Sequence, residues 1–561
     1  MKYNALSKPL LYDSQLKTRL QLAKKRLEAY PLNDMNFMTM DLEHPTRRRR
    51  QADFCSYDLT GRTLLFYSLA DGIDGTHIDR LPELYKRIMN NRRPDGLFVH
   101  PEVAYPGLNA PHWNLVYTHF LSGLVNYYSL TGDMRALDAA EEAASNWLDR
   151  KEELDALIRS NGKAPHNMAA WLTEGFADLY RETGNQKYLD AVKYIKNECF
   201  GGFNGAHSHG YLTTLRGIMR AAIYANDREL ADFVKEKREE ILKNGVTEIG
   251  DICEAFPHNS PRNEGCSIAD WVMLNLLYGH YFDDADAYKI AEHSLWNALF
   301  FNQFVTGGFG HRHFAYRGYR TYIEEAWWCC TQNAGYCISE VARHVVTVRN
   351  GKIHLNFLIP GEFTIPSEQK DITVTVTTKF PTKATTVIKV NGTKEDIEIR
   401  IPDYIKGVTW RRVETDFGYT IYLDGKMGHY TEKYPDGYLL KYGPLVLAPM
   451  YYSWDMTTKA PDETTIPEGY LRETMPGYKC ALDLGAADEN GFYKLDHNPI
   501  PKWLIYEEGE MADISGGEVA AVNVPVCFDK GMSKTLYFQP ICSATSCLIL
   551  NDIPMVFDLK E

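Results

Sequence analysis

The chain has 561 residues, of which 44% are hydrophobic and 24% charged, and its formal net charge is −13. A chain of this length should divide into two to four domains. The acidic balance argues against nucleic acid as the main partner, because phosphate neutralisation needs a basic face. No apolar run reaches 18 residues and the first residues lack the apolar stretch of a secretory signal. We therefore expect no membrane span and a cytoplasmic location.

The first part of the chain, to about residue 345, has the periodicity of helices and contains an internal repeat. Residues 119–141 and 171–193 share an amphipathic helix, a Thr-Gly pair and a second helix, with Thr131 and Thr183 52 residues apart. Residues 273–295 form a looser third copy. Repeated helical hairpins near 50 residues form an open solenoid or a closed barrel. Because this length suits six hairpins, we predict an (α/α)6 barrel as the catalytic domain over residues 1–345.

After residue 350 the apolar period changes to two, which is typical of strands. Asn-Gly and Asp-Gly turns separate these segments, and the clearest of them are 371–380, 385–392, 396–402 and 419–425. We predict two β-sandwich domains, 346–445 and 446–540, with residues 541–561 as candidates to rejoin the first. No strand carries a cluster of titratable residues, so we expect the sandwiches to shield and stabilise the barrel.

The eleven cysteines are unevenly placed, and five of them lie between residues 253 and 337. Glu264 and Cys266 are two positions apart, and the adjacent pair Cys329 and Cys330 begins 63 residues after Cys266. One carboxylate and three thiolates suit a tetrahedral zinc ion. On spacing alone, a zinc site and a set of inert buried thiols are equally good interpretations.

The same residues carry a family resemblance. Glu254-Ala255-Phe256, Glu264-x-Cys266 and Cys329-Cys330-x-x-Asn333 resemble the signature of the β-L-arabinofuranosidases of glycoside hydrolase family 127 and relatives. The resemblance implies an (α/α)6 barrel followed by β-sandwich domains, and a retaining exo-hydrolase acting on an oligosaccharide or glycoside that carries L-arabinofuranose or a related sugar. It also implies that a zinc cofactor is held by Glu264, Cys266, Cys329 and Cys330.

The resemblance further assigns roles within the site. Cys329 takes the place of the nucleophile and Glu254 that of the acid/base. His119, His209 and Glu292 match positions that bind the sugar. Several positions depart from the family pattern: Gly265 replaces a threonine, and Thr331-Gln332 replaces two prolines. The resemblance therefore specifies the reaction class more closely than the sugar.

Two other functions remain open. A sugar epimerase or lyase on the same kind of barrel would use histidines, including His311 and His313, and would need no zinc. A non-catalytic carbohydrate-binding protein could hold a structural zinc, since four protein ligands are usual in structural sites. Glu254 argues against the second alternative, because a structural zinc needs no spare carboxylate. The sequence is compatible with a homodimer and does not specify which glycosidic linkage is cleaved.

Overall fold

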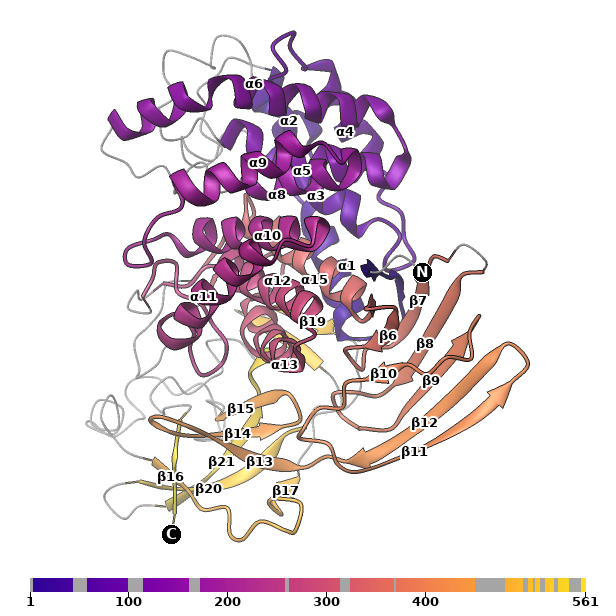
Figure 1. Ribbon diagram of the computed structural model, residues 1–561. Helices are drawn as coiled ribbons and strands as arrows, with labels where there is room; N and C mark the ends of the chain where they lie inside the picture. The colour runs from indigo at the N-terminus through magenta and orange to yellow at the C-terminus, as the bar shows by residue number, and fades with distance from the viewer. Residues whose placement is uncertain are drawn as a thin grey trace, which may run out of the picture.

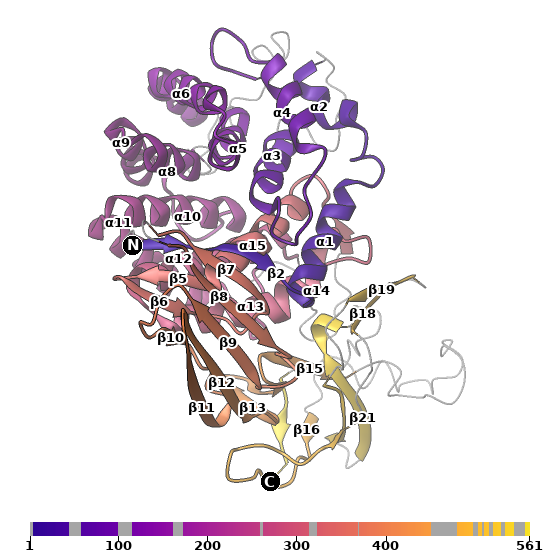
Figure 2. The same ribbon diagram turned by 90° about the vertical axis from the view of Figure 1, so that its right-hand side faces the viewer.

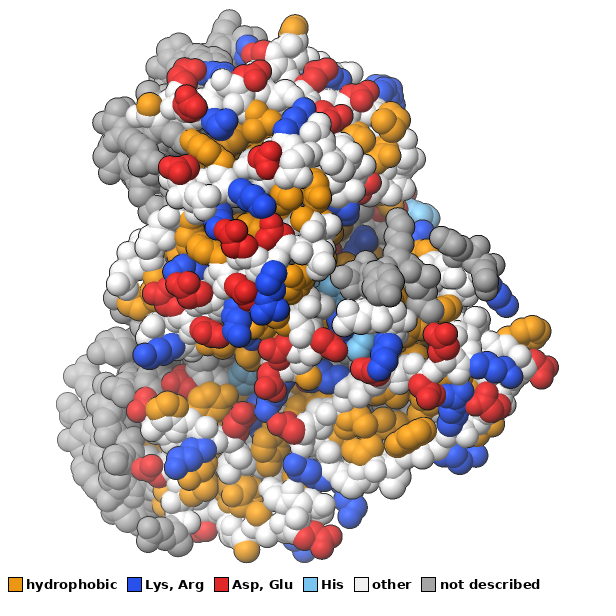
Figure 3. All heavy atoms as spheres, in the orientation of Figure 1, with side chains coloured by type: hydrophobic (Ala, Val, Ile, Leu, Met, Phe, Trp, Pro, Cys, Tyr) orange, Lys and Arg blue, Asp and Glu red, His pale blue; other side chains and the backbone are white. Residues whose placement is uncertain are grey.

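Helices occupy one end of the molecule and sheets the other, so the coarse prediction of a helical part followed by strands is confirmed (Figure 1). The computed structural model describes residues 4–43, 58–98, 115–160, 172–257, 262–312, 323–367, 370–449, 480–497, 503–507, 510–514, 520–528, 533–543 and 556–560. Within these ranges, no helix is long and apolar enough to cross a membrane. Acidic and basic side chains are interspersed over the face seen in Figure 3.

Six helices contact one another in a closed order, with the last touching the first again. They are α3 (Asp58–Ala70), α5 (Leu115–Thr131), α8 (Leu172–Thr183), α10 (Ser208–Ala225), α12 (Gly265–Phe282) and α15 (Cys330–His344). A second set of helices packs outside this ring, each against one or two ring helices (Figure 2). These are α1 (Gln15–Leu27), α4 (Leu81–Asn90), α6 (Met134–Ser160), α9 (Gln186–Tyr194), α11 (Arg228–Asn244) and α13 (Ala285–Ser294), with the shorter α2 (Met35–Glu43) and α14 (Phe300–Asn302) nearby.

The Thr-Gly repeat marks equivalent helix ends. α5 and α8 both stop at the threonine, and the following Gly132 and Gly184 have φ of 75° and 65°. The hydroxyls of Thr131 and Thr183 donate to carbonyls one turn back, at 2.8 and 2.7 Å. A left-handed residue after the last turn is the usual stop signal, and glycine adopts it without a steric penalty. The sequence repeat is therefore a structural repeat of neighbouring ring helices.

The strands form three main sheets. A four-stranded sheet has the order β1 (Asn4–Leu6), β5 (Val346–Arg349), β6 (Lys352–Leu355), β10 (Glu398–Ile399). A six-stranded sheet has the order β11 (Lys406–Thr415), β12 (Gly418–Lys426), β9 (Thr386–Asn391), β8 (Ile372–Thr378), β7 (Gly361–Ile365), β2 (Lys8–Leu11). A third sheet has the order β13 (His429–Tyr434), β14 (Gly437–Tyr442), β15 (Leu445–Pro449), β21 (Ser533–Pro540), β20 (Val522–Phe528), β16 (Cys480–Leu482), β22 (Asp558–Leu559), with β17 (Asp496–His497) beside β20. Two hairpins, β3 (Gly310–Arg312) with β4 (Ile323–Glu325) and β18 (Trp503–Glu507) with β19 (Glu510–Ile514), are separate.

Strand pairing divides the chain differently from the sequence-based boundaries. β1 and β2 lie in the segment expected to be helical, yet they pair with β5 and β7. β13 and β14 precede the predicted boundary at residue 446 but belong to the C-terminal sheet through β15. β22 pairs with β16 in that same sheet, and Phe557 just before it forms an antiparallel bridge with Tyr438 of β14, so the C-terminal segment contacts strands that precede residue 446. Local patterns do not reveal such pairings, because the partners are far apart in sequence.

A single hydrophobic cluster runs from the ring helices into the six-stranded sheet. It includes buried side chains of both parts, such as Leu65 and Val341 from helices and Val374 and Ile388 from strands. The C-terminal sheet has a smaller cluster of its own around Leu447 and Phe538. The helical part and the six-stranded sheet thus share one core.

Candidate active site

The first turns of four ring helices bring the candidate residues together. Asp58 begins α3, His209 lies in the first turn of α10, Cys266 in that of α12, and Cys330 begins α15. Helix N-termini carry partial positive charge and unpaired backbone N–H groups. This end of the ring therefore favours anionic groups such as thiolates and carboxylates.

Glu264, Cys266, Cys329 and Cys330 form one compact, buried cluster, as their match to the family signature predicts. Their ligand atoms all lie within 4.8 Å of one another. The Sγ atom of Cys330 is 3.4 Å from that of Cys266 and 3.7 Å from that of Cys329. Thiolates around a tetrahedral zinc, with Zn–S bonds of about 2.3 Å, would be about 3.8 Å apart. The donor set and its spacing fit a metal ion.

The three thiols differ in their electrostatic environment. Burial raises the pKa values of Cys266 and Cys330 well above the usual range for thiols. Hydrogen bonds from these two thiols instead lower the pKa of Cys329 well below that range. Cys329 is also the most exposed of the four, at 8% against 5% for Glu264 and 0% for the other two. It is the member of the cluster that combines anionic character with access.

Glu254 lies on the loop between α11 and α12, next to this cluster. A backbone bridge between Cys253 and Asn263 narrows the loop, and Glu254 donates its N–H to the carbonyl of Arg262 at 2.9 Å. Burial and the nearby Glu264 carboxylate raise the pKa of Glu254. The Arg262 side chain forms an ion pair with it at 3.1 Å. A raised pKa and partial exposure are properties of a carboxyl group that can donate a proton at neutral pH.

His207 is a site residue that the sequence analysis missed. Its Nε2 atom lies 3.1 Å from the Glu264 carboxylate. His207, Glu254 and Glu264 together place ligand atoms within 4.8 Å of one another. His207 therefore links the acid/base candidate to the cluster. Its position directly before α10, two residues from His209, was the only signal in the sequence.

His119 and His209 lie in a buried chain of polar contacts. His119 Nδ1 is 2.7 Å from Asp58, Asp58 is 2.6 Å from Arg62, and Arg62 is 2.9 Å from His209 Nε2. His209 Nδ1 is in turn 2.5 Å from Asp270. Burial and the Arg62 charge lower the pKa of His119 to about 4, so its ring is neutral at pH 7. The structure thus places both histidines at the cluster end of the ring, within a fixed network.

Arg62 is a second residue that sequence reasoning missed. It is 3% exposed, and burial opposes its charge, but Asp58 and the thiols of Cys266 and Cys329 outweigh that effect and raise its pKa.

Asn333, the last residue of the family signature, connects the two helices α12 and α15 that carry the cluster. Its side chain donates to the Cys266 carbonyl at 3.0 Å and to Asp270 at 2.8 Å.

Glu292 lies elsewhere. It is on α13 with 2% exposure, and its two carboxylate oxygens accept hydrogen bonds from Arg400 and Tyr404, both at 2.8 Å. It lines a cavity to which none of the four cluster residues contributes.

His311 contacts the Asn263 carbonyl at 2.6 Å and lies beside Arg262, whereas His313 is outside the described residues.

Gly265 separates two cluster residues and has a steric reason to be glycine. A Cβ atom there would lie 2.6 Å from Oδ1 of Asn302 and 3.3 Å from Cβ of Cys330. Asn302 cannot easily move, because its side chain bonds both the N–H and the carbonyl of Gly310, at 3.0 and 2.9 Å. The replacement of the family's threonine by Gly265 therefore allows Asn302 to pack against the cluster.

Comparison with known proteins bears on the chemistry of this site. A family model described as "Beta-L-arabinofuranosidase, GH127 catalytic domain" matches residues 85–336, which include all four cluster residues and Glu254. Among curated proteins, none matches the sequence significantly.

Three solved structures share the fold over nearly the whole chain. A GH127 β-arabinofuranosidase is 14% identical, with 96% of this chain and 95% of that chain covered and a TM-score of 0.69. A GH127 β-L-arabinofuranosidase from Geobacillus stearothermophilus T6 is 14% identical, with coverage of 96% and 98% and a TM-score of 0.70. A protein described as a glycoside hydrolase is 13% identical, with coverage of 100% and 98% and a TM-score of 0.66. The chain is thus a glycoside hydrolase whose residues 85–336 match the model of the GH127 β-L-arabinofuranosidase catalytic domain and whose fold is shared with GH127 enzymes.

Proposed function

We propose that the protein is a retaining exo-glycosidase that releases L-arabinofuranose or a related sugar. In this proposal Cys329 is the nucleophile, Glu254 the acid/base, and zinc the metal held by Glu264, Cys266, Cys329 and Cys330. The helical part is an (α/α)6 barrel and the strands that follow form β-sandwich domains. The observation that carries the proposal is the juxtaposition of Glu254 with a buried cluster of one carboxylate and three thiols.

Retention of configuration needs two steps. In the first, Sγ of Cys329 bonds to the anomeric carbon while the bond to the leaving oxygen breaks, and Glu254 gives that oxygen its proton. In the second, Glu254 removes a proton from water, the water oxygen bonds to the anomeric carbon, and the carbon–sulfur bond breaks. Burial and the nearby Glu264 carboxylate raise the pKa of Glu254, which favours the protonated form that the first step needs.

A zinc ion would stabilise the thiolate form of cysteine at neutral pH and make the sulfur a better leaving group. The chain supplies the rest of the arrangement. His207 holds Glu264 by its 3.1 Å contact, and Asn333 keeps α12 and α15 in register. Burial of Cys266 and Cys330 excludes water from the inner side of the cluster.

Substitution of Cys329 and Glu254 tests the two roles. Cys329→Ser should abolish turnover of an aryl L-arabinofuranoside, because a hydroxyl is a much poorer nucleophile than a thiolate at neutral pH. Glu254→Gln should lose about 10²–10⁴-fold on a natural glycoside but less on a substrate with an activated leaving group. Added azide should restore the second step in Glu254→Gln by replacing the deprotonated water.

Mass spectrometry after treatment with an electrophilic sugar analogue provides the control. The label should appear on Cys329 and not on Cys337, which is fully buried on the same helix. Equal losses on activated and natural substrates, without azide rescue, would show that Glu254 is not the acid/base.

A further inference from the structure

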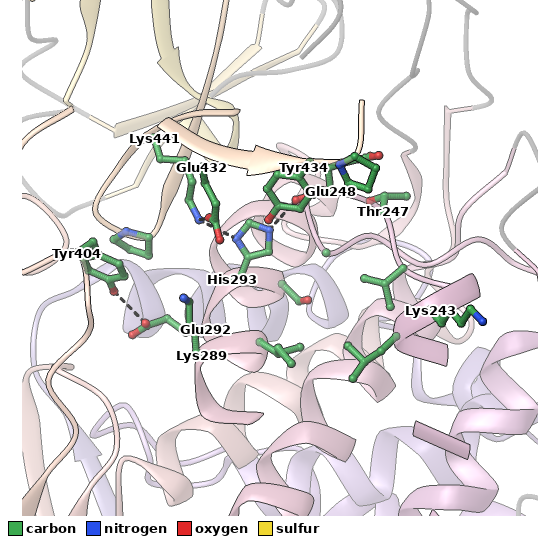
Figure 4. Close-up of a pocket in the computed structure, with 17 residues that line it drawn as sticks. Lys243, Thr247, Glu248, Lys289, Glu292, His293, Tyr404, Glu432, Tyr434 and Lys441 are labelled. Carbon is green, nitrogen blue, oxygen red and sulfur yellow. Dashed lines mark hydrogen bonds and ion pairs between the residues drawn. The ribbon is translucent and has the colours of Figure 1, made fainter. Parts of the chain in front are cut away.

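A cavity lies where α13 meets the C-terminal sheet, and none of the cysteine-cluster residues lines it. Its volume is about 440 Å³, within the range of about 300–1,000 Å³ typical of small-molecule sites. Residues from four segments line it, namely 242–250, 289–294, 404 and 432–444 (Figure 4). The main ones are Lys289, His293, Tyr404, Glu432, Tyr434 and Lys441.

The polar groups of this cavity are held in fixed positions. Lys441 Nζ on β14 is 2.6 Å from the Glu432 carboxylate on β13 and 3.4 Å from Nδ1 of His293. Nε2 of His293 donates to the Glu248 carbonyl at 2.8 Å, which leaves Nδ1 as an acceptor. Burial and the Lys441 charge lower the pKa of His293 to about 3, so the ring is neutral. Nδ1 already accepts from the Asn297 amide at 3.2 Å, so the donor and the acceptor that the cavity offers side by side are the Lys441 ammonium and the Glu432 carboxylate.

The charged side chains that line the cavity limit the kind of ligand that it can bind. Three lysines and three glutamates line the cavity, namely Lys243, Lys289, Lys441, Glu248, Glu292 and Glu432. With His293 neutral, this lining favours neither an anion nor a cation. Ser294 Oγ also lines the cavity, is fully buried, and has no hydrogen-bond partner among the described residues. An unpaired buried hydroxyl costs free energy that a ligand hydroxyl would recover.

Apolar surface completes the lining. The rings of Tyr404 and Tyr434 and the prolines Pro435 and Pro444 border the cavity. The Tyr404 hydroxyl is already engaged by Glu292, so its ring offers chiefly its apolar body. The cavity thus combines hydrogen-bond donors and acceptors with aromatic rings. This combination suits a neutral ligand whose ring carries several hydroxyl groups and has an apolar face.

We propose that this cavity is a second, non-catalytic carbohydrate site that binds one sugar unit of the glycan substrate. The inference rests on the proposed function for its substrate class, but none of the metal-cluster residues takes part in it. Binding here would hold one part of a glycan against the junction of α13 with the C-terminal sheet while another part is cleaved.

Calorimetric titration of the full-length protein tests the inference. The probe is a thio-linked L-arabinofuranosyl disaccharide, which resists hydrolysis. We expect two molecules bound per chain, one at the cluster and one in the cavity. Leu242→Trp, at a lining position that is 37% exposed, should obstruct the cavity with an indole ring and leave one molecule bound. Tyr434→Ala should weaken the second site about tenfold, equivalent to about 1.4 kcal/mol.

Tyr422→Ala is the matched control, because Tyr422 is a 42% exposed tyrosine on β12 that does not line the cavity. It should keep both sites, and Leu242→Trp should hydrolyse an aryl L-arabinofuranoside at the wild-type rate. A single bound probe in the wild-type protein, or two in Leu242→Trp, would overturn the inference. If the wild-type protein does not hydrolyse the aryl L-arabinofuranoside but the cavity still binds the probe, the proposed function is refuted and the cavity remains a carbohydrate site.

Discussion

At the scale of single residues, the site depends on close packing as much as on the reactive groups. Gly265 is the clearest case, since Asn302 occupies the space that a Cβ atom would need. The side chain of Asn302 in turn holds the strand that begins at Gly310. The packing beside Cys266 and Cys330 is thus coupled to residues outside the cluster.

This coupling gives a prediction for Gly265→Ala. We expect it to lower the free energy of unfolding by about 1–3 kcal/mol, because an added methyl in a packed core forces its neighbours to move. Asn302→Ala alone should also destabilise the protein, since two hydrogen bonds are lost. The double variant should be more stable than the sum of the two losses, because the clash is absent. Urea unfolding of all three proteins measures this coupling.

Gly202→Ala serves as the control, since a Cβ atom there meets nothing within 4 Å. It should change stability by less than about 0.5 kcal/mol. Strictly additive effects of Gly265→Ala and Asn302→Ala would contradict the steric explanation.

The roles of individual residues were only partly predictable from sequence. Glu264, Cys266, Cys329 and Cys330 matched a spaced signature, and the fold brings them together. Arg62 and His207 carried no such signature, because their importance comes from neighbours contributed by other helices. Glu292 had the right spacing from Cys266, yet α13 carries it to Arg400 and Tyr404.

At the scale of elements, the cluster joins the N-termini of α12 and α15. Neither helix alone supplies enough ligands for a metal, since α12 contributes Glu264 and Cys266 and α15 contributes the cysteine pair. A bound ion would therefore act as a crosslink between neighbouring ring helices. Three thiols so close together repel one another once ionised, which adds to the need for a cation.

Metal content and stability should consequently change together. We expect close to one zinc per chain, measured by elemental analysis of protein purified under reducing conditions. Removal of the ion with a chelator should lower Tm, and Cys330→Ser should do the same. Cys337→Ala is the matched control, because Cys337 is equally buried on α15 but lies outside the cluster. Full activity in protein without metal would refute the zinc assignment.

The Thr-Gly repeat shows which elements a sequence reveals. Thr131-Gly132 and Thr183-Gly184 act through local backbone geometry, so the pattern and the structure agree. The strands of residues 346–426 were also visible, because alternation of apolar residues is local. β1 and β2 were missed, since their stability comes from partners more than 300 residues away.

At the scale of the whole molecule, the chain does not separate into a helical unit and a strand unit. β2 pairs with β7 at the edge of the six-stranded sheet, and Leu11 at its end belongs to the core shared with the helices. A substitution that destabilises β2 should therefore destabilise the helical part and the six-stranded sheet together.

Neighbouring leucines on β2 allow this to be measured. Leu11 is 1% exposed and Leu10 is 39% exposed. Leu11→Ala should cost about 2–5 kcal/mol, whereas Leu10→Ala should cost less than about 0.5 kcal/mol. Circular dichroism during urea unfolding should show helix and strand signals lost in one transition. Two separate transitions in Leu11→Ala, with the helical one unchanged, would contradict a shared core.

The pairing of β1 with β5 and of β2 with β7 also sets an order of events during synthesis. The first two strands leave the ribosome well before their partners, because the whole helical part is made in between. At about 5–20 residues per second, the delay is roughly 20–70 s. During that interval β1 and β2 have exposed edges and no sheet to join, so completion of this fold awaits the translation of residues beyond 360.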